Sequence, residues 1–282
     1  MKQKIRIPNE IANDVQWLYT QDWEYCDYGN CKRHLQIIFP FKREWTGNES
    51  YPLILFIPGS AWHKQEMYND IPQYAEIAKR GFAVIAMEYR ESEIASFPAQ
   101  IEDVSNALKF IATFAEKFHI DMKRLFLMGN SSGAHIALMA ALFNANGLCE
   151  PLPKISGVIA ESAPTDILLC AKDPLPEWFK IRPSAALLGV EEIKGNEDLA
   201  EKASCSMYIN DSIKLPPILL IHSEFDPIVS VENSRKLYEE LTFANKDVLY
   251  YEIEGNAEHG GPTFFNGQVL DIIQDFCNKH ND

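Results

Sequence analysis

Continuous apolar runs, more than alternating ones, supply the strand candidates of this chain. They are residues 34–40, 52–57, 82–87, 124–128, 155–160, 217–221 and 247–253. A strand that is apolar at successive positions is buried on both faces, so these runs predict a mostly parallel sheet. Helical patterns fall between the runs, at residues 71–80, 98–118, 134–144, 231–241 and 264–279.

Strands that alternate with helices predict an α/β fold, with helices on both faces of a central sheet of about eight strands. We expect a single domain over residues 1–282. The periodicity breaks down between Ser162 and Pro216, a stretch that contains several prolines and the pair Trp178–Phe179. Because this stretch is too long for a simple crossover, residues 163–215 are predicted to form a small lid insertion after the sixth strand.

The run at residues 125–128 leads directly into Gly129-Asn-Ser131-Ser-Gly133, and an apolar helix pattern follows. Strand, sharp turn and helix in this order are the context in which G-x-S-x-G presents a nucleophilic serine. The turn strains the backbone at the serine, so the positions two before and two after it must be small. We therefore predict Ser131 as nucleophile. The rival hydroxyl, Ser132, lacks a glycine two positions earlier, and a plain small-residue turn is the alternative interpretation.

Asp226 and His259 each follow a predicted strand, as Ser131 does. The carboxyl ends of parallel strands meet at one edge of a sheet, where ligands bind. In the predicted chemistry Ser131 attacks an acyl carbon, His259 transfers the proton, and Asp226 orients the imidazole. Asp166 and Glu224 are alternative acids, but Asp226 precedes a helix in the place expected for such a residue.

The turn Pro58-Gly59-Ser60-Ala61-Trp62 directly follows the run at residues 52–57. Small residues there let backbone N–H groups approach developing negative charge, as an oxyanion hole requires, although a plain strand-to-loop turn is the alternative. We predict the amides of Ser60, Ala61 and Ser132 as oxyanion donors. The side chains expected to contact substrate are Trp62, Asn130 and Trp178. Trp178 and Phe179 could equally form a dimer contact, so a homodimer is left open.

Composition narrows the classes of partner. The formal net charge is −14, which disfavours nucleic acids and anionic membranes because both are polyanions. The six cysteines follow no zinc-site spacing, and neither an apolar signal region nor a membrane span is evident. We expect a cytoplasmic protein with free thiols, a Cys26–Cys31 disulfide being the minority alternative, and no metal or cofactor.

The chain resembles the α/β-hydrolase superfamily in its carboxylesterase branch, near hormone-sensitive-lipase-like proteins and the feruloyl and acetylxylan esterase-like group. The resemblance lies in residues 128–135, 221–226 and 255–260, and in the order Ser…Asp…His. It implies a structural role for Tyr89–Arg90 and for residues 97–103. One departure is the oxyanion turn, where the usual His-Gly-Gly-Gly is Pro58-Gly-Ser-Ala61.

The expected function is that of a serine esterase acting on small, short-chain carboxylic esters through an acyl-enzyme. The larger side chains in the oxyanion turn predict a narrow acyl pocket, and acetylated carbohydrates are implied as substrates by the resemblance alone. Two alternatives remain. One is an exopeptidase or amidase, with Glu88, Glu91 or Glu161 binding the peptide amine; the other is a non-catalytic ligand-binding protein on a hydrolase scaffold.

Overall fold

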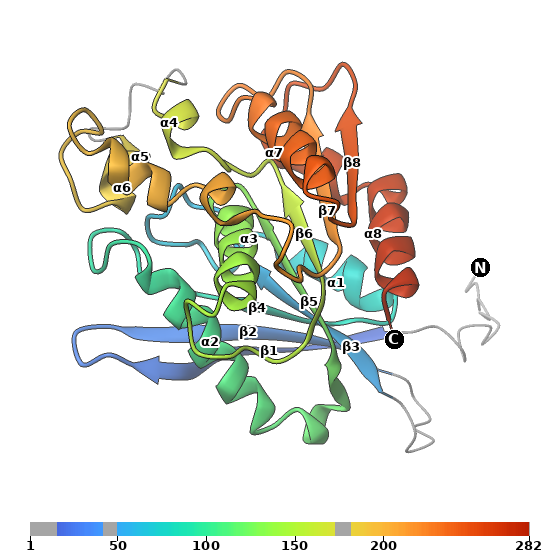
Figure 1. Cartoon of the computed structure of the whole chain (residues 1–282). Coiled ribbons are helices and arrows are strands. Elements are labelled where there is room, and N and C mark those ends of the chain that lie inside the picture. Colours follow the sequence, from blue (N-terminus) through green and yellow to red (C-terminus); the bar gives the residue numbers. More distant parts are fainter. Residues whose placement is uncertain (1–15, 42–49, 173–181, 282) are drawn as a thin grey trace, which may run out of the picture.

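A computed structural model describes residues 16–41, 50–172 and 182–281, which contain an eight-stranded sheet (Figure 1). Its order is β1-β2-β4-β3-β5-β6-β7-β8. The strands are β1 (Gln16–Asp27), β2 (Lys32–Phe41), β3 (Tyr51–Ile57), β4 (Ala83–Met87), β5 (Ile120–Asn130), β6 (Ile155–Glu161), β7 (Ile218–Ser223) and β8 (Val248–Ile253). From β4 to β8 every neighbouring pair is parallel, whereas β1–β2 and β2–β4 are antiparallel. The predicted, mostly parallel sheet of about eight strands is confirmed.

Helices cover both faces of the sheet, as predicted. The longer helices are α1 (Ile71–Lys79), α2 (Ala99–Ala112), α3 (Ser132–Ala145), α7 (Glu232–Phe243) and α8 (Gly267–Lys279). Buried side chains of α2, α3 and α7 share one apolar core, and those of α1 and α8 share a second one on the opposite face. In Figure 1, α3 lies in front of the sheet. Two cores explain why β3, β4 and β6 are buried at every position.

The edge strand β1 is absent from the strands that the apolar runs predicted. Most of its side chains are exposed or half-buried, and its pairing with β2 shifts register between Thr20 and Trp23, around Asp22 at a φ of 58°. A bulged strand with solvent on one face lacks the continuous apolar run by which the other strands were found.

The helix expected over residues 98–118 is shorter than predicted. α2 ends at Ala112, and only a 3₁₀ turn, η1 (Glu116–Phe118), follows before β5. Trp23 packs against the rings of Phe114 and Phe118 at centroid distances of 4.9 and 5.5 Å. This contact with the edge strand holds the chain where it reverses into the sheet, and no local pattern encodes it.

The segment between β6 and β7 carries the short helices α4 (Ile167–Cys170), α5 (Pro183–Leu187) and α6 (Glu197–Lys202) and the 3₁₀ turn η2 (Cys205–Tyr208). Both of its ends are fastened near α7. Asn233 Oδ1 accepts a hydrogen bond from the Asp166 amide at 3.0 Å, and the Asn233 backbone carbonyl accepts one from Thr165 Oγ1 at 2.8 Å. The Cys205 amide, near the other end of the segment, donates to the Thr165 carbonyl. That this segment acts as a lid stays a prediction.

Within the described ranges, no helix has both the length and the apolar character needed to cross a bilayer. All six cysteines carry free thiols, so the alternative Cys26–Cys31 disulfide is not formed.

Candidate active site

The turn after β5 holds Ser131 in a strained conformation, with φ 52° and ψ −128°. A Cβ on Gly133 would lie 1.9 Å from the Ile57 carbonyl oxygen, and one on Gly129 would lie 2.5 Å from the Gly133 carbonyl carbon. Both positions therefore require glycine, which gives the steric reason for the G-x-S-x-G spacing. The Ser131 amide donates to the Glu161 carbonyl at 2.8 Å and ties the strained turn to β6. Such strain persists where surrounding contacts enforce it.

The three side chains predicted for catalysis lie in one hydrogen-bonded row. His259 Nε2 is 2.8 Å from Ser131 Oγ, although 128 positions separate the two residues. His259 Nδ1 is 2.7 Å from Asp226 Oδ2. Because Asp226 accepts from Nδ1–H, the neutral imidazole leaves the Nε2 lone pair facing the serine hydroxyl. The row has the order nucleophile, base and orienting acid.

The surroundings of the Asp226 carboxylate, which is fully buried, keep it ionised. Its Oδ1 accepts the Ile228 and Val229 amides at 2.9 and 3.0 Å, and His222 Nε2 lies 3.4 Å from Oδ2. Burial alone would raise the pKa of Asp226, but the hydrogen bonds from His222 and His259 and the charge on His259 outweigh it and hold this pKa well below its ordinary value. A permanently charged acid suits the orientation of an imidazole.

The two alternative acids, Asp166 and Glu224, form hydrogen bonds elsewhere. Asp166 caps α4 by accepting the Leu169 amide and pairs with Lys236 at 2.5 Å. Glu224 accepts the Gly255 amide at 2.8 Å.

The turn after β3 presses against the serine. A Cβ on Gly59 would lie 2.8 Å from Ser131 Cβ, so a larger residue there would displace one of the two turns. Ala61 and Trp62 both have positive φ, 53° and 60°, which is unusual for residues other than glycine. The Ser60 amide already donates to Ser132 Oγ at 2.9 Å. Among the described residues, the Ala61 and Ser132 amides have no acceptor.

The three predicted substrate contacts have different outcomes. Trp62 is only 4% exposed, and its indole N–H donates to His135 Nδ1 at 3.2 Å, so the side chain packs beneath the turn instead of facing an open surface. Asn130 Oδ1 accepts a hydrogen bond from the Gly59 amide at 2.7 Å and thereby anchors the turn after β3. Trp178 lies outside the described residues. We assign packing and anchoring roles to Trp62 and Asn130.

His135, on α3, packs against Trp62 and forms hydrogen bonds through both ring nitrogens. It is fully buried, and its Nε2 lies 2.7 Å from the Ala203 carbonyl oxygen. Burial lowers the pKa of His135 to about 4, so the ring is neutral. Its two hydrogen bonds connect Trp62, in the turn after β3, to Ala203, in the segment between β6 and β7.

Glu161 is a feature that the sequence did not reveal as unusual. It ends β6, is fully buried, and neither carboxyl oxygen has a partner among the described residues. Burial, together with the negative charge of Asp70, raises the pKa of Glu161 to about 8. A single sequence does not show whether an acidic residue at the end of a strand is buried or exposed, so only the packing identifies Glu161 as a buried acid.

We expect Glu161→Gln to flatten the pH dependence of stability. The unfolded side chain ionises near pH 4.5 and the folded one near pH 8, so the unfolded chain binds fewer protons across this window and stability falls as pH rises. At 1.36 kcal/mol per pKa unit, the loss is on the order of a few kcal/mol. Urea unfolding at pH 5 and pH 8 measures it, with the exposed Glu66→Gln as control. An equal loss of stability in wild type and Glu161→Gln would contradict this assignment.

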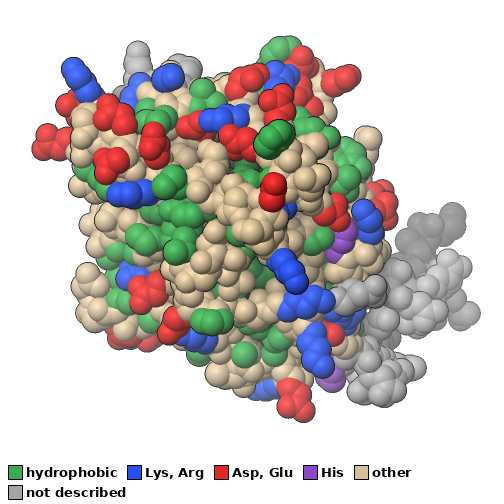
Figure 2. Space-filling view, in the orientation of Figure 1, with side chains coloured by type: hydrophobic (Ala, Val, Ile, Leu, Met, Phe, Trp, Pro, Cys, Tyr) green, Lys and Arg blue, Asp and Glu red, His purple; other side chains and the backbone are tan. Residues whose placement is uncertain are grey.

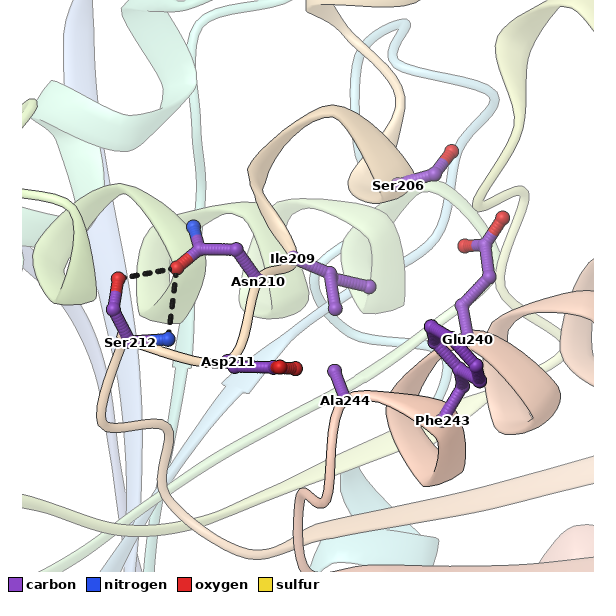
Figure 3. Close-up of a pocket in the computed structure, with 8 residues that line it drawn as sticks. All are labelled: Ser206, Ile209, Asn210, Asp211, Ser212, Glu240, Phe243 and Ala244. Atoms are coloured by element: carbon purple, nitrogen blue, oxygen red, sulfur yellow. Dashed lines mark hydrogen bonds between the residues drawn. The ribbon is translucent and has the colours of Figure 1, made fainter.

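The figures show two further features of the surface. On the face in Figure 2, Asp and Glu side chains gather along the upper edge, over the short helices that follow β6 and over α7. Figure 3 shows a pocket of about 600 Å³ between the loop after η2 and the end of α7. Its lining includes Asn210, whose Oδ1 accepts from the amide and the hydroxyl of Ser212. No predicted catalytic residue is among the eight that line this pocket.

Among the described residues, no group of three or more His, Cys, Asp or Glu side chains is arranged to hold a metal ion.

Curated relatives are named as esterases. The chain is 24% identical over 242 residues to Esterase LipQ of Mycobacterium tuberculosis, a match that covers 80% of this chain and 54% of that protein. It is also 24% identical over 202 residues to isoprenylcysteine alpha-carbonyl methylesterase ICME of Arabidopsis thaliana, covering 67% and 46%. The chain thus spans about half the length of these relatives.

A solved structure described as a truncated carbohydrate esterase from gut microbiota superposes with a TM-score of 0.80 at 25% identity, covering 96% of this chain and 98% of that chain. Esterase B from Lactobacillus rhamnosis superposes with a TM-score of 0.73 at 17% identity, covering 98% and 91%. These likenesses identify the fold as that of an α/β-hydrolase, as the sequence predicted. Residues 36–241, most of the chain, match the model of one family. The chain belongs to the BD-FAE family.

Proposed function

We propose that this protein is a serine esterase that hydrolyses short-chain carboxylic esters, with acetyl esters of carbohydrates as the substrate class. The observation that carries the proposal is the continuous contact from Ser131 Oγ through His259 to Asp226, at 2.8 and 2.7 Å. A nucleophile, a base within hydrogen-bond reach and an acid that orients the base are the parts that acyl transfer needs. The names of the relatives agree with this chemistry.

In the proposed mechanism Ser131 Oγ attacks the ester carbonyl carbon while His259 Nε2 takes the hydroxyl proton. The tetrahedral oxyanion binds to the amides of Ala61 and Ser132, which have no acceptor among the described residues. The carbon–oxygen bond to the alcohol then breaks, and His259 returns its proton to the leaving alkoxide. Water, activated by the same imidazole, hydrolyses the acyl-enzyme and restores Ser131. Each oxyanion donor typically contributes about two to three orders of magnitude in rate.

The choice of substrate rests on two observations. Ser60 and Ala61 carry side chains where the resembling family has glycines, which favours a small acyl group. The relative with the higher TM-score is described as a carbohydrate esterase.

Of the three glutamates considered for an exopeptidase, two are bound to other residues and the third is buried. Glu88 Oε2 accepts the His34 amide and contacts its ring nitrogen, both at 2.9 Å. Glu91 pairs with Arg33, and Glu161 is fully buried. A carboxylate that binds a peptide amine must be exposed to the substrate, so these three residues do not favour that reading.

Acetate release from xylose tetraacetate, compared with turnover of p-nitrophenyl acetate and octanoate, tests the proposal. We expect saturable release of acetate, and slower turnover of the octanoyl than of the acetyl ester. Aminoacyl p-nitroanilides serve as the amide control and should react far more slowly. Faster octanoyl cleavage would contradict the narrow acyl site, and a folded protein inert toward every ester would point instead to a ligand-binding role.

A further inference from the structure

Three hydroxyl groups meet behind the oxyanion turn. Ser60 follows β3, Tyr89 follows β4 and Ser132 follows β5, and these strands are neighbours in the sheet. Tyr89 Oη lies 2.8 Å from Ser60 Oγ and 3.1 Å from Ser132 Oγ, and the Ser60 amide donates to Ser132 Oγ at 2.9 Å. These contacts close a ring of hydrogen bonds that starts and ends at Ser60.

The donor direction in every bond of the ring follows from one contact. Ser60 Oγ donates its only proton to the His63 carbonyl, so it must accept from Tyr89. The Tyr89 proton is then used, and Ser132 Oγ must donate to Tyr89 Oη. Ser132 Oγ is left with lone pairs, which accept the Ser60 amide. Each hydroxyl of the ring donates one hydrogen bond and accepts another.

Burial makes this arrangement rigid. Tyr89 is 0% and Ser132 is 1% exposed, so a hydroxyl that lost its partner would have no water to replace it. Gln65, also buried, fastens the ring to its surroundings: Oε1 accepts the Tyr89 amide at 2.9 Å and Nε2 donates to the His63 carbonyl. Burial also raises the pKa of Tyr89 to about 12, so its phenol stays protonated and able to donate.

We propose that this ring selects the oxyanion donors, and that Tyr89 is a positioning residue which acts through Ser60 and Ser132. The inference rests on the proposed esterase function. By binding the Ser60 amide, the ring withdraws one of the three predicted donors and leaves the Ala61 and Ser132 amides for the oxyanion. It also engages the Ser132 hydroxyl in two hydrogen bonds, which explains why Ser132 does not compete with Ser131 as nucleophile.

The test is Tyr89→Phe, which removes the hydroxyl that joins Ser60 to Ser132 and keeps the aromatic side chain in place. We expect kcat for p-nitrophenyl acetate to fall roughly 10- to 100-fold with KM nearly unchanged, because the oxyanion forms only in the transition state. The Ki of a trifluoromethyl ketone, which forms a tetrahedral oxyanion on the serine, should rise by the same factor. The matched control is Tyr19→Phe on the edge strand β1, which removes a tyrosine hydroxyl that donates to Gln36 on β2 and should change neither value.

Ser60→Ala provides a second variant in case Tyr89→Phe does not fold. Its effect should have the same sign, and the double variant should lose little more than the larger single loss, because either change opens the same ring. The ring proposal would be overturned if the losses of the two single variants added in the double variant. It would also be overturned if an active Tyr89→Phe enzyme kept the kcat and the inhibitor Ki of the wild type. Either result would leave the esterase proposal intact. An inert but folded wild type would instead overturn the esterase proposal, and the role of the ring with it.

Discussion

Ser131→Ala is expected to lose about four to six orders of magnitude in kcat for p-nitrophenyl acetate, while the protein stays folded. Ser131 Oγ is the atom that His259 Nε2 contacts at 2.8 Å, and without it no acyl-enzyme can form. A residual rate of about 10³ to 10⁴ over water is expected to remain, since binding and the oxyanion amides persist. Initial rates, together with covalent labelling by a fluorophosphonate probe, measure both parts of the result.

Two controls make the result specific to this hydroxyl. Ser206→Ala changes a serine among the residues that line the pocket in Figure 3 and should retain full activity and labelling. Mass spectrometry of peptides from the labelled wild type should locate the probe on Ser131 and not on Ser132. Labelling of Ser132, or undiminished turnover by Ser131→Ala, would refute the assignment of the nucleophile.

Asp226→Asn is the second large effect, with an expected loss in kcat of about 10³- to 10⁴-fold at neutral pH. The reason lies in the two amides of Ile228 and Val229, which donate to Oδ1. They will hold the carbonyl oxygen of the new asparagine, so its NH₂ group must face His259. The imidazole then accepts at Nδ1 and carries its proton on Nε2, where it cannot accept the proton of Ser131.

The pH profile of kcat/KM and the rate of fluorophosphonate labelling should fall together in this variant, because both need the same base. Glu224→Gln is the matched control, since this carboxylate also follows β7 but binds the Gly255 amide, and it should keep most of the activity. A larger loss in Glu224→Gln than in Asp226→Asn would reassign the orienting acid.

Local patterns were sufficient for the fold class. Continuous apolar runs predicted the strands that are buried on both faces. The G-x-S-x-G turn was also predictable, because the strand, the turn and the helix follow one another directly in the sequence, although the clash that requires Gly133 is with Ile57 on a neighbouring strand. The edge strand β1 was missed because it lacks a continuous apolar run. The early end of α2 was missed because the turn after it packs against Trp23, which is distant in the sequence.

Some features of the candidate site could also be predicted from local patterns, and others could not. The order Ser131, Asp226, His259 and their positions after predicted strands were visible in the sequence, because the carboxyl ends of parallel strands meet at one edge. The availability of each amide was not visible, because the Ser60 amide is bound by a hydroxyl 72 positions away. The inward packing of Trp62, the hydrogen-bond ring through Tyr89 and the burial of Glu161 also depend on contacts between distant segments. The sequence determined which residues reach the site, whereas only the tertiary structure decided which of their hydrogen-bonding groups remain available, because burial and partners are set by segments that meet only in the folded chain.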